Sequence, residues 1–359
     1  MNRDPVLFRV DGTKQTGWER FNRCLTYSAA LQRRRRQAFF RSQLDPASLA
    51  LPIKRIGNEW LEADDPVATG LDLSETIQEI RRIRPAAVIV DSPNISEEYL
   101  SEVSAAGPLV VSIEHEPTIR YPSALVINPM LEPGRDSFDF VPGTQLLLGR
   151  RYAIVRPEIR RVRQIRAQEP LAPFRVLIAL GDDDKGQVLE LVRKLIALSK
   201  LERIDVAVRS YHPLLQQLNQ LQAAHPKRLE LAMEPAEVTA KISRCHFAIS
   251  SGDSWSLELA CVGVPQLVIV QSEFHWPTAR RLEDEGVAVC LGENANVSTS
   301  VLKQSIHDIL DDSWERQAMS RCGRKLIDGR GPDRLVTALE VLLHPSRLID
   351  FHEPENFAA

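Results

Sequence analysis

Residues 250–270, SSGDSWSLELACVGVPQLVIV, join small polar side chains to a following helical pattern. Small residues at the end of a strand let backbone N–H groups approach an anion, and the helix dipole favours negative charge there. A diphosphate is such an anion. The alternative is an ordinary helix N-cap made by Ser or Asp. The residues predicted to contact a nucleotide in this loop are Ser251, Gly252, Asp253 and Ser254.

A carboxylate follows this loop at helical spacing. Glu258 lies four residues after Ser254, which is about one helical turn. A carboxylate in that place can accept hydrogen bonds from both hydroxyls of a ribose. The alternative is a solvent-facing Glu on a surface helix. Further along, His275 and Trp276 either line a pocket for the base or sugar or, for Trp276, pack in the core.

A second set of reactive side chains lies between Gly17 and Arg23. The guanidinium groups of Arg20 and Arg23 are suited to a diphosphate or to an acidic sugar. Glu19 lies beside them, so it would stay ionised and could accept a proton from water or from a hydroxyl. It is equally well explained as a surface residue whose charge complements a helix dipole.

Two further polar residues follow apolar runs. Asp91 ends the run 86–91, where it either contacts a substrate hydroxyl, acts in catalysis or caps a loop. His115 lies in the acidic segment 111–116, VSIEHE, and is predicted to contact the substrate. These positions add a second candidate region to the one around residue 250.

The sequence gives no clear metal site. Three carboxylates at residues 182–184 would repel a phosphate, so either Mg²⁺ bridges them or the loop points elsewhere, and we favour the second explanation. The eight histidines are scattered and the five cysteines form no CxxC pair. We therefore expect no metal and no cofactor, free buried thiols, and a nucleotide sugar as substrate.

Apolar runs alternate with helical patterns around these positions. This alternation implies parallel sheets that helices cover on both faces. In the first half, strands are expected at 5–10, 86–91, 109–113 and 124–129, and helices at 18–36, 73–84 (capped by Ser74) and 96–107. In the second half, the main strands are expected at 174–181, 204–210, 246–251 and 265–270, again with helices between them.

A length of 359 residues favours two domains, because one hydrophobic core seldom organises so long a chain. Residues 157–173 are charged and contain three prolines, two of them near the end of the stretch, so we expect a linker there. The predicted order is a domain at 1–156, the linker, a second domain at 174–345 and a tail at 346–359. Two doubly wound domains suit a ligand at the carboxyl ends of their strands.

Composition excludes several classes of protein. With 43% hydrophobic and 26% charged residues, the chain is typical of globular proteins, and no stretch approaches the ~20 apolar residues of a membrane span. The N-terminus lacks the features of a signal peptide, so we expect a cytoplasmic protein. A net charge of −3 argues against nucleic acid as partner, and the basic run Arg33–Arg36 is expected to be a solvated helix end. The oligomeric state stays open.

Eight segments recur in the order of a known family. The sequence resembles the UDP-sugar hydrolases of the pseudaminic acid pathway and the related spore-coat polysaccharide proteins described as predicted glycosyltransferases. The segment 250–270 is also similar to the nucleotide-binding motif of GT-B enzymes such as the peptidoglycan transferase that makes lipid II. The segments are LFRVDG with Gln15, Gly17 and Arg23, VIVD ending on Asp91, VSIEHE at 111–116, INP at 127–129, GRRYAIVRPEI at 149–159, IALGDDD at 178–184, residues 250–270, and DGRGPDRLV at 328–336.

This resemblance implies a GT-B-like fold, with two Rossmann-like α/β domains facing across a cleft. It places Glu258 on the ribose of UDP and places Gly17, Arg20, Arg23, His115 and Tyr152 on the substrate side. One loop departs from the pattern. The family has Gly-x-Gly-His-x-x-Arg, whose His is thought to position or activate water, whereas this chain has Glu19 and Arg20 at the second Gly and the His. Arg cannot act as a general base.

The predicted function is therefore that of a UDP-sugar enzyme in bacterial surface-glycan synthesis. It would either hydrolyse the sugar C–O bond or transfer the sugar to an acceptor, with Glu19 or Asp91 in catalysis. The alternative is a catalytically silent homologue that binds a nucleotide sugar as a partner subunit or sensor. CMP is the competing nucleotide.

Overall fold

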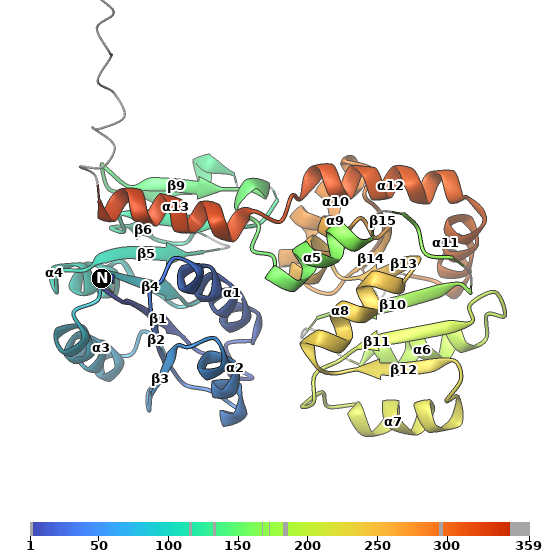
Figure 1. The fold of residues 1–359 in the computed structure, drawn as a ribbon, viewed down its shortest axis with the longest axis horizontal. Coiled ribbons are helices and arrows are strands. Elements are labelled where there is room, and N and C mark those ends of the chain that lie inside the picture. The colour runs from blue at the N-terminus through green and yellow to red at the C-terminus, as the bar shows by residue number, and fades with distance from the viewer. Residues whose placement is uncertain are drawn as a thin grey trace, which may run out of the picture. The chain divides into compact units, whose positions relative to one another are not determined.

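The computed structural model describes residues 3–114, 117–131, 134–166, 168–171, 173–181, 186–293 and 297–344. The chain forms two compact units (Figure 1). The first comprises residues up to Ile154 together with the segment from Arg330, and the second comprises Val155–Gly329. Among the described residues, no helix is long and apolar enough to cross a membrane.

The first unit is built on a parallel sheet in the order β3-β2-β1-β4-β5-β7-β9. Its strands are β1 Val6–Val10, β2 Ala38–Ser42, β3 Glu59–Glu62, β4 Ala87–Asp91, β5 Leu109–Ile113, β7 Leu125–Asn128 and β9 Gln145–Leu148. Its helices are α1 Glu19–Arg33, α2 Ala50–Arg55, α3 Gly70–Ile83, α4 Glu97–Ala105 and α13 Gly331–Leu343. Shorter elements are the strand pair β6 Arg120–Tyr121 and β8 Asp139–Phe140 and the 3₁₀ turns η1 Ala47–Leu49, η2 Arg135–Ser137 and η3 Arg150–Tyr152.

Side-chain alternation along the strands explains why both faces of this sheet are covered. In β1, Val6, Phe8 and Val10 join the core beneath α1 and α13, whereas Leu7 joins the core beneath α3 and α4. Successive residues of a strand point to opposite faces, so an uninterrupted apolar run needs cover on both. The doubly wound arrangement predicted from the sequence is confirmed for this unit.

The second unit has a parallel sheet in the order β12-β11-β10-β13-β14-β15. Its strands are β10 Arg175–Ala179, β11 Arg203–Ala207, β12 Leu229–Ala232, β13 Phe247–Ser250, β14 Gln266–Val270 and β15 Ala288–Glu293. Its helices are α5 Pro157–Ile165, α6 Gln187–Ile196, α7 Leu215–Ala224, α8 Pro235–Arg244, α9 Ser254–Val262, α10 Trp276–Asp284, α11 Thr299–Asp311 and α12 Ser313–Leu326, with the 3₁₀ turn η4 Glu273–His275 before α10.

The predicted linker is wrong at its start. Residues 157–165 form α5, because Pro157 suits a first helical turn and Ile159 and Val162 are buried. Arg163 donates to the carbonyls of Cys261 (2.7 Å) and Ile327 (2.8 Å), where α9 and α12 end. Guanidinium groups near helix C-termini satisfy carbonyls that the helix leaves unpaired. The charges of this segment therefore dock a helix rather than solvate a linker.

The C-terminal boundary also differs from the prediction. Helix α13 was assigned to the second domain, yet it packs on the first unit, where Tyr27 donates to the carbonyl of Leu335 (3.2 Å). The predicted tail lies outside the described residues. Sequence patterns did not identify β2, β3, β9, β15 or α2, and α3 is capped by Thr69, not Ser74. These are short or edge elements, whose patterns are the weakest.

The basic run is not a solvated helix end throughout. Arg36 is 1% exposed and donates to both carboxylate oxygens of Glu340 in α13, at 2.8 and 3.2 Å. Arg33 pairs with Asp333 of the same helix at 2.7 Å. Two of the four arginines therefore fasten α13 to the rest of the first unit. The buried Arg36 needs this pairing, because buried cations need anionic partners.

Glu340 should make the first unit sensitive to acid. Burial raises the pKa of its carboxyl, but Arg36 and Arg3 outweigh burial, so the pKa lies below the ordinary Glu value. A lowered folded-state pKa stabilises the protein above the unfolded value near 4.3 and loses that contribution as the pH falls through the folded value. We expect Glu340→Gln to cost about 1–3 kcal/mol at pH 7. The gap from the parent should close below about pH 4.

Denaturant unfolding of both proteins between pH 3.5 and 7 measures this gap. The control is Glu102→Gln on α4, because Glu102 is exposed and its side chain makes no hydrogen bond or ion pair among the described residues. A gap that stays constant with pH would show that the loss comes from packing, not from the charge.

Candidate functional site

Both groups of candidate residues lie where the strand order of their sheet reverses. In the first sheet this point is between β1 and β4, and Asp91 is the last residue of β4. In the second it is between β10 and β13, and Ser250 is the last residue of β13. In doubly wound sheets, ligands bind at such points, outside the carboxyl ends of the strands. The strand order alone therefore indicates both places as candidate ligand sites.

Residues Ser250–Ser256, here called the Ser251 loop, are fixed by uncharged hydrogen bonds. Ser250 donates its hydroxyl to Gln266 (2.8 Å), and Gln266 donates in turn to the carbonyl of Ser256 (3.0 Å). The N–H of Gly252 donates to the Ser256 hydroxyl (2.9 Å). The loop is thus held from within and from the neighbouring strand β14.

Gly252 cannot be replaced easily. Its φ is +88°, and a Cβ there would lie 2.9 Å from the carbonyl oxygen of His275. Only glycine adopts this backbone conformation without strain. The Ser251 loop therefore lies directly against the residues that begin α10, and the buried His275 forms part of that contact.

Asp253 acts as the N-cap of α9. Its carboxylate accepts from the backbone N–H of Trp255 (3.0 Å) and of Ser256 (3.4 Å). The other carboxylate oxygen lies where a Cβ of Gly181, at the end of β10, would come within 2.2 Å of it. The N-cap alternative weighed for this loop is thus what the structure shows for Asp253. A capping carboxylate also satisfies N–H groups that would otherwise face an anion.

One hydroxyl of this loop is left over. Ser251 is fully buried, and its Oγ has no hydrogen-bond partner among the described residues. Thr278, in the first turn of α10, is 1% exposed and has a hydroxyl in the same condition. Buried hydroxyls without partners are uncommon and need a physical reason. A bound ligand whose oxygens accept hydrogen bonds from these hydroxyls would be such a reason.

Glu258 is neither free nor solvent-facing. It is 6% exposed, and its two oxygens accept from the side chain of Arg156, at 2.9 Å from Nε and 2.7 Å from Nη2. The backbone N–H of Arg156 also donates to Oε1 (3.2 Å). The Arg156 guanidinium lies 5.2 Å from the ring centre of Trp255, within the range of a cation–π contact. The ribose contact stays a prediction, and it must accommodate this pair.

In the first unit, Asp91 is the centre of a cluster of five residues, which we call the Asp91 cluster. Arg23 donates Nε to Oδ2 and Nη2 to Oδ1, both at 2.5 Å, so the guanidinium forks around the carboxylate. Arg20 donates Nη1 to Oδ1 at 3.1 Å and lies 3.9 Å from Glu114, the residue after β5. Cys24 donates its thiol to Oδ2 (3.4 Å).

This environment decides which state each group adopts. Burial lowers the pKa of Arg23, but Asp91 outweighs burial and the pKa lies above the ordinary value. Burial, followed by the charge of Asp91, raises the pKa of the Cys24 thiol well above its ordinary value, so Cys24 stays protonated. Asp91 is 1% exposed and accepts four hydrogen bonds. It is placed to hold Arg20 and Arg23, not to take a proton from a substrate.

The remaining predicted residues have different surroundings. Glu19 begins α1, is half-buried, and makes no side-chain hydrogen bond or ion pair within the described ranges. Gly17 has φ +76°, and a Cβ there would meet no atom within 4 Å. Tyr152, which is predicted to contact the substrate, is partly buried and packs against the core of the first unit, and its substrate contact stays a prediction. His115 and residues 182–184 lie outside the described residues.

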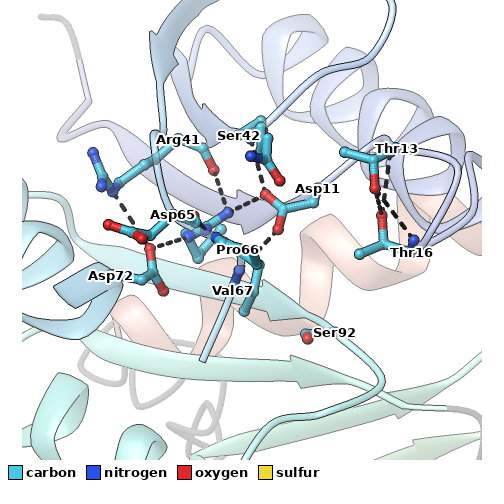
Figure 2. A network of polar contacts seen from close by, with 12 residues as sticks. Asp11, Thr13, Thr16, Arg41, Ser42, Asp65, Pro66, Val67, Asp72 and Ser92 are labelled. Atoms are coloured by element: carbon cyan, nitrogen blue, oxygen red, sulfur yellow. Dashed lines mark hydrogen bonds and ion pairs between the residues drawn. The ribbon is translucent and has the colours of Figure 1, made fainter. Parts of the chain in front are cut away.

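A buried network that sequence patterns did not predict surrounds Arg9 in β1, and Figure 2 shows its members Asp11 and Asp72. Arg9 is fully buried and donates to Asp11 (2.5 Å) and to Asp72 of α3 (2.7 Å). Asp11 also accepts from the N–H of Gln43 (2.9 Å) and of Val67 (2.8 Å). Arg9 and Asp11 belong to the LFRVDG segment. Their charges pair with partners inside the protein, and this pairing fixes the loop that follows β1.

No cluster of His, Cys, Asp and Glu suited to a metal ion occurs in the part of the chain that the structure describes. The two candidate places therefore consist of arginine–carboxylate pairs in the first unit and hydroxyls with one arginine–carboxylate pair in the second. Their chemistry is that of anion and hydroxyl recognition.

Comparisons with known proteins give a relative in sequence and several solved structures of similar fold. No family model matches the chain. The spore coat polysaccharide biosynthesis protein SpsG of Bacillus subtilis is 26% identical over 231 residues, which cover 63% of this chain and 66% of SpsG. The match therefore spans just under two thirds of that relative. It supports the predicted resemblance to spore-coat polysaccharide proteins, whereas the resemblance to pseudaminic acid hydrolases stays a prediction.

Solved structures give the fold. MurG of Acinetobacter baumannii superposes with a TM-score of 0.63 at 15% identity, covering 94% of this chain and 99% of MurG. The UDP-GlcNAc 2-epimerase of Neisseria meningitidis, bound to UDP-GlcNAc, has a TM-score of 0.59 at 14% identity, covering 93% and 99%. The spinosyn rhamnosyltransferase SpnG has a TM-score of 0.64 at 15% identity, covering 94% and 100%. The predicted GT-B fold is thus confirmed.

The Arg156–Glu258 pair should stabilise the second unit measurably. In a double-mutant cycle of Arg156→Met and Glu258→Gln, we expect a coupling energy of about 1–3 kcal/mol, because the pair is largely buried and forked. The control pair is Lys200–Asp311, 2.7 Å apart but exposed on both sides. Its coupling energy should be clearly smaller than that of Arg156–Glu258, because solvent screens an exposed pair. Urea unfolding measures both cycles, and equal coupling in the two pairs would contradict the expectation.

Proposed function

We propose that this protein binds a nucleoside diphosphate sugar, with UDP as the nucleotide, and acts on its glycosidic bond in bacterial surface-polysaccharide synthesis. The observation that carries the proposal is the Ser251 loop. It lies at the strand-order reversal of the second sheet, its glycine is required by close packing, and its buried Ser251 hydroxyl lacks a partner among the described residues. The likeness to SpsG supports the role in polysaccharide synthesis.

The second unit would hold the nucleotide. Ser251 would donate to a phosphate oxygen, with Gly252 and Ser254 beside it, while Asp253 keeps its role as N-cap. Glu258 would accept from the ribose hydroxyls, with Arg156 holding the carboxylate in place. We propose that no metal ion takes part, because the buried hydroxyls of Ser251 and Thr278 can donate to phosphate oxygens.

The first unit would supply the reacting groups. The bond between the anomeric carbon and the diphosphate oxygen breaks with its electron pair going to the diphosphate. A new bond forms to the oxygen of water or of an acceptor hydroxyl, whose proton goes to a carboxylate. Glu19 is the best candidate, because Asp91 is fully engaged by Arg20, Arg23 and Cys24. Whether water or an acceptor reacts decides between hydrolase and transferase.

A second candidate function has one observation in its favour. Arg20 stands where the resembling family has its His, and it is tied to Asp91. A homologue that binds the nucleotide sugar without turnover, as a partner subunit or sensor, would have such a first loop. Turnover measurements separate this candidate from the enzyme.

Calorimetric titration with UDP, CMP and UDP-N-acetylglucosamine tests the nucleotide site. We expect UDP to bind, and Glu258→Ala to weaken UDP binding at least about tenfold through loss of charged hydrogen bonds. The control Glu202→Ala removes an exposed carboxylate of the same unit. The titration is repeated with EDTA, and the affinity should not change. Binding of none of the nucleotides would overturn the proposal, and CMP binding alone would change the nucleotide.

Glu19→Gln tests the catalytic part. If Glu19 accepts the proton, turnover should fall about 10²- to 10⁴-fold. UDP affinity should stay that of the parent, since the nucleotide contacts lie in the second unit. Release of UDP and of free sugar is followed with and without candidate acceptors, with Glu102→Gln as control. Undiminished turnover would assign Glu19 to the surface, and a parent protein that binds but never turns over would favour the silent homologue.

A further inference from the structure

Arg20 is held through one of its nitrogens only. Its Nη1 donates to Asp91 and lies 3.9 Å from Glu114, and both of those carboxylates are buried. Within the described ranges, Nε and Nη2 of Arg20 make no hydrogen bond, and neither is among the buried atoms without a partner. The edge of the guanidinium that carries Nε and Nη2 is therefore oriented by Asp91 but makes no hydrogen bond to any described residue.

The neighbouring arginine shows the contrast. Arg23 offers both Nε and Nη2 to Asp91 and its side chain is 5% exposed, whereas the Arg20 side chain keeps 18% exposure. Beside Arg20, Gly17 has φ +76° and opens to a space in which a Cβ would meet no atom within 4 Å. Arg23 is thus a positioning residue for Asp91, and Arg20 is the residue that can reach a ligand.

The geometry of the open edge selects a type of ligand. Parallel N–H groups on Nε and Nη2 match the two oxygens of a carboxylate. The local charge argues against a phosphate dianion, because Arg20 and Arg23 are balanced by Asp91 and Glu114, with Glu19 adding a negative charge nearby. A second negative charge on the ligand would be repelled without a further cation to meet it.

We propose that Arg20 binds the carboxylate of an acidic sugar, carried either by the nucleotide sugar or by the acceptor. This inference rests on the proposed function and narrows its substrate class from sugars in general to sugar acids. It also gives a reason for Arg at a position where the resembling family has His: the residue recognises a substrate charge and does not move a proton.

Two pairs of compounds test the inference by calorimetry on the full chain. UDP-glucuronate and UDP-glucose differ only in a carboxylate against a hydroxymethyl group. Glucuronate and glucose, added with UDP and also without it, make the same comparison for an acceptor. In one of these two comparisons, we expect the acid to bind about tenfold more tightly than its neutral counterpart. This difference is the effect of one charge-assisted contact. Arg20→Gln should abolish that preference and leave UDP affinity unchanged, while Arg20→Lys should keep part of it.

The control is Arg34→Gln, which removes an exposed arginine at the other end of α1. It should keep the preference for the acid. Thermal unfolding confirms that each variant folds, as expected because Arg23 still pairs with Asp91.

Three results would overturn the inference: no preference for the acid in either arm, a preference that survives Arg20→Gln, or a loss of affinity for UDP itself in Arg20→Gln. The last result would place Arg20 on the diphosphate. If UDP does not bind at all, the proposed function has failed, and the glucuronate arm without nucleotide then decides the inference by itself.

Discussion

Charged side chains at the carboxyl ends of the central strands of the first sheet are buried, and opposite charges keep them so. Arg9 lies between Asp11 and Asp72, and Asp91 lies within the fork of Arg23. An unpaired charge in such a place costs several kcal/mol, so removing one partner would destabilise the burial of the other. The loops that follow β1 and β4 are therefore fixed by electrostatics and less by apolar packing.

This constraint explains why Arg20 is available. A carboxylate offers a limited number of lone pairs, and those of Asp91 are largely used by Arg23 and Cys24. Arg20 can add one bond only, which fixes its position and leaves one edge of its guanidinium open. Preorganised groups lose little entropy on binding, so a side chain fixed in this way is well suited to recognise a ligand.

At the strand-order reversal of the second sheet, the described loop is fixed with few charged side chains. This reversal point is lined by Ser250, Ser251 and Gly252, whose contacts are hydroxyl and backbone hydrogen bonds. Asp253 serves the N-terminus of α9, and Glu258 of the same helix pairs with Arg156. Among the described residues, this place has fewer fixed charges that a charged ligand must match than the Asp91 cluster has. Such a division of roles agrees with a nucleotide in the second unit and a sugar in the first.

Much of the fold follows from the sequence, and the reasons are physical. Apolar runs such as those of β4 and β13 are buried on both faces, which only a parallel sheet with helices on each side allows. Short edge strands such as β3 carry little apolar pattern, since half of their residues are exposed. The docking of α13 rests on Arg36 and Glu340, which lie 304 positions apart, and no local pattern reports such a pair.

The candidate site divides in the same way. Loop positions were predictable because chain order places Asp91 and Ser251 at the ends of strands, and strand ends meet at one edge of a sheet. Partners were not predictable, because composition does not show whether Asp91 accepts a substrate proton or the fork of Arg23. Glu258 poses the same problem, since it meets Arg156 from 102 positions away.

The pairing of Glu258 need not conflict with a role in binding. Arg156 stands two residues after the end of the first unit's main segment, and both its backbone N–H and its side chain contact the carboxylate. A carboxylate fixed in this way keeps its oxygens in one orientation, and carboxylate oxygens are strong acceptors for hydroxyl groups. The same contacts also occupy lone pairs that a ribose would need. The balance between these two effects depends on how easily Arg156 gives up its contacts with Glu258. The strength of the Arg156–Glu258 pair therefore bears directly on the affinity for a nucleotide.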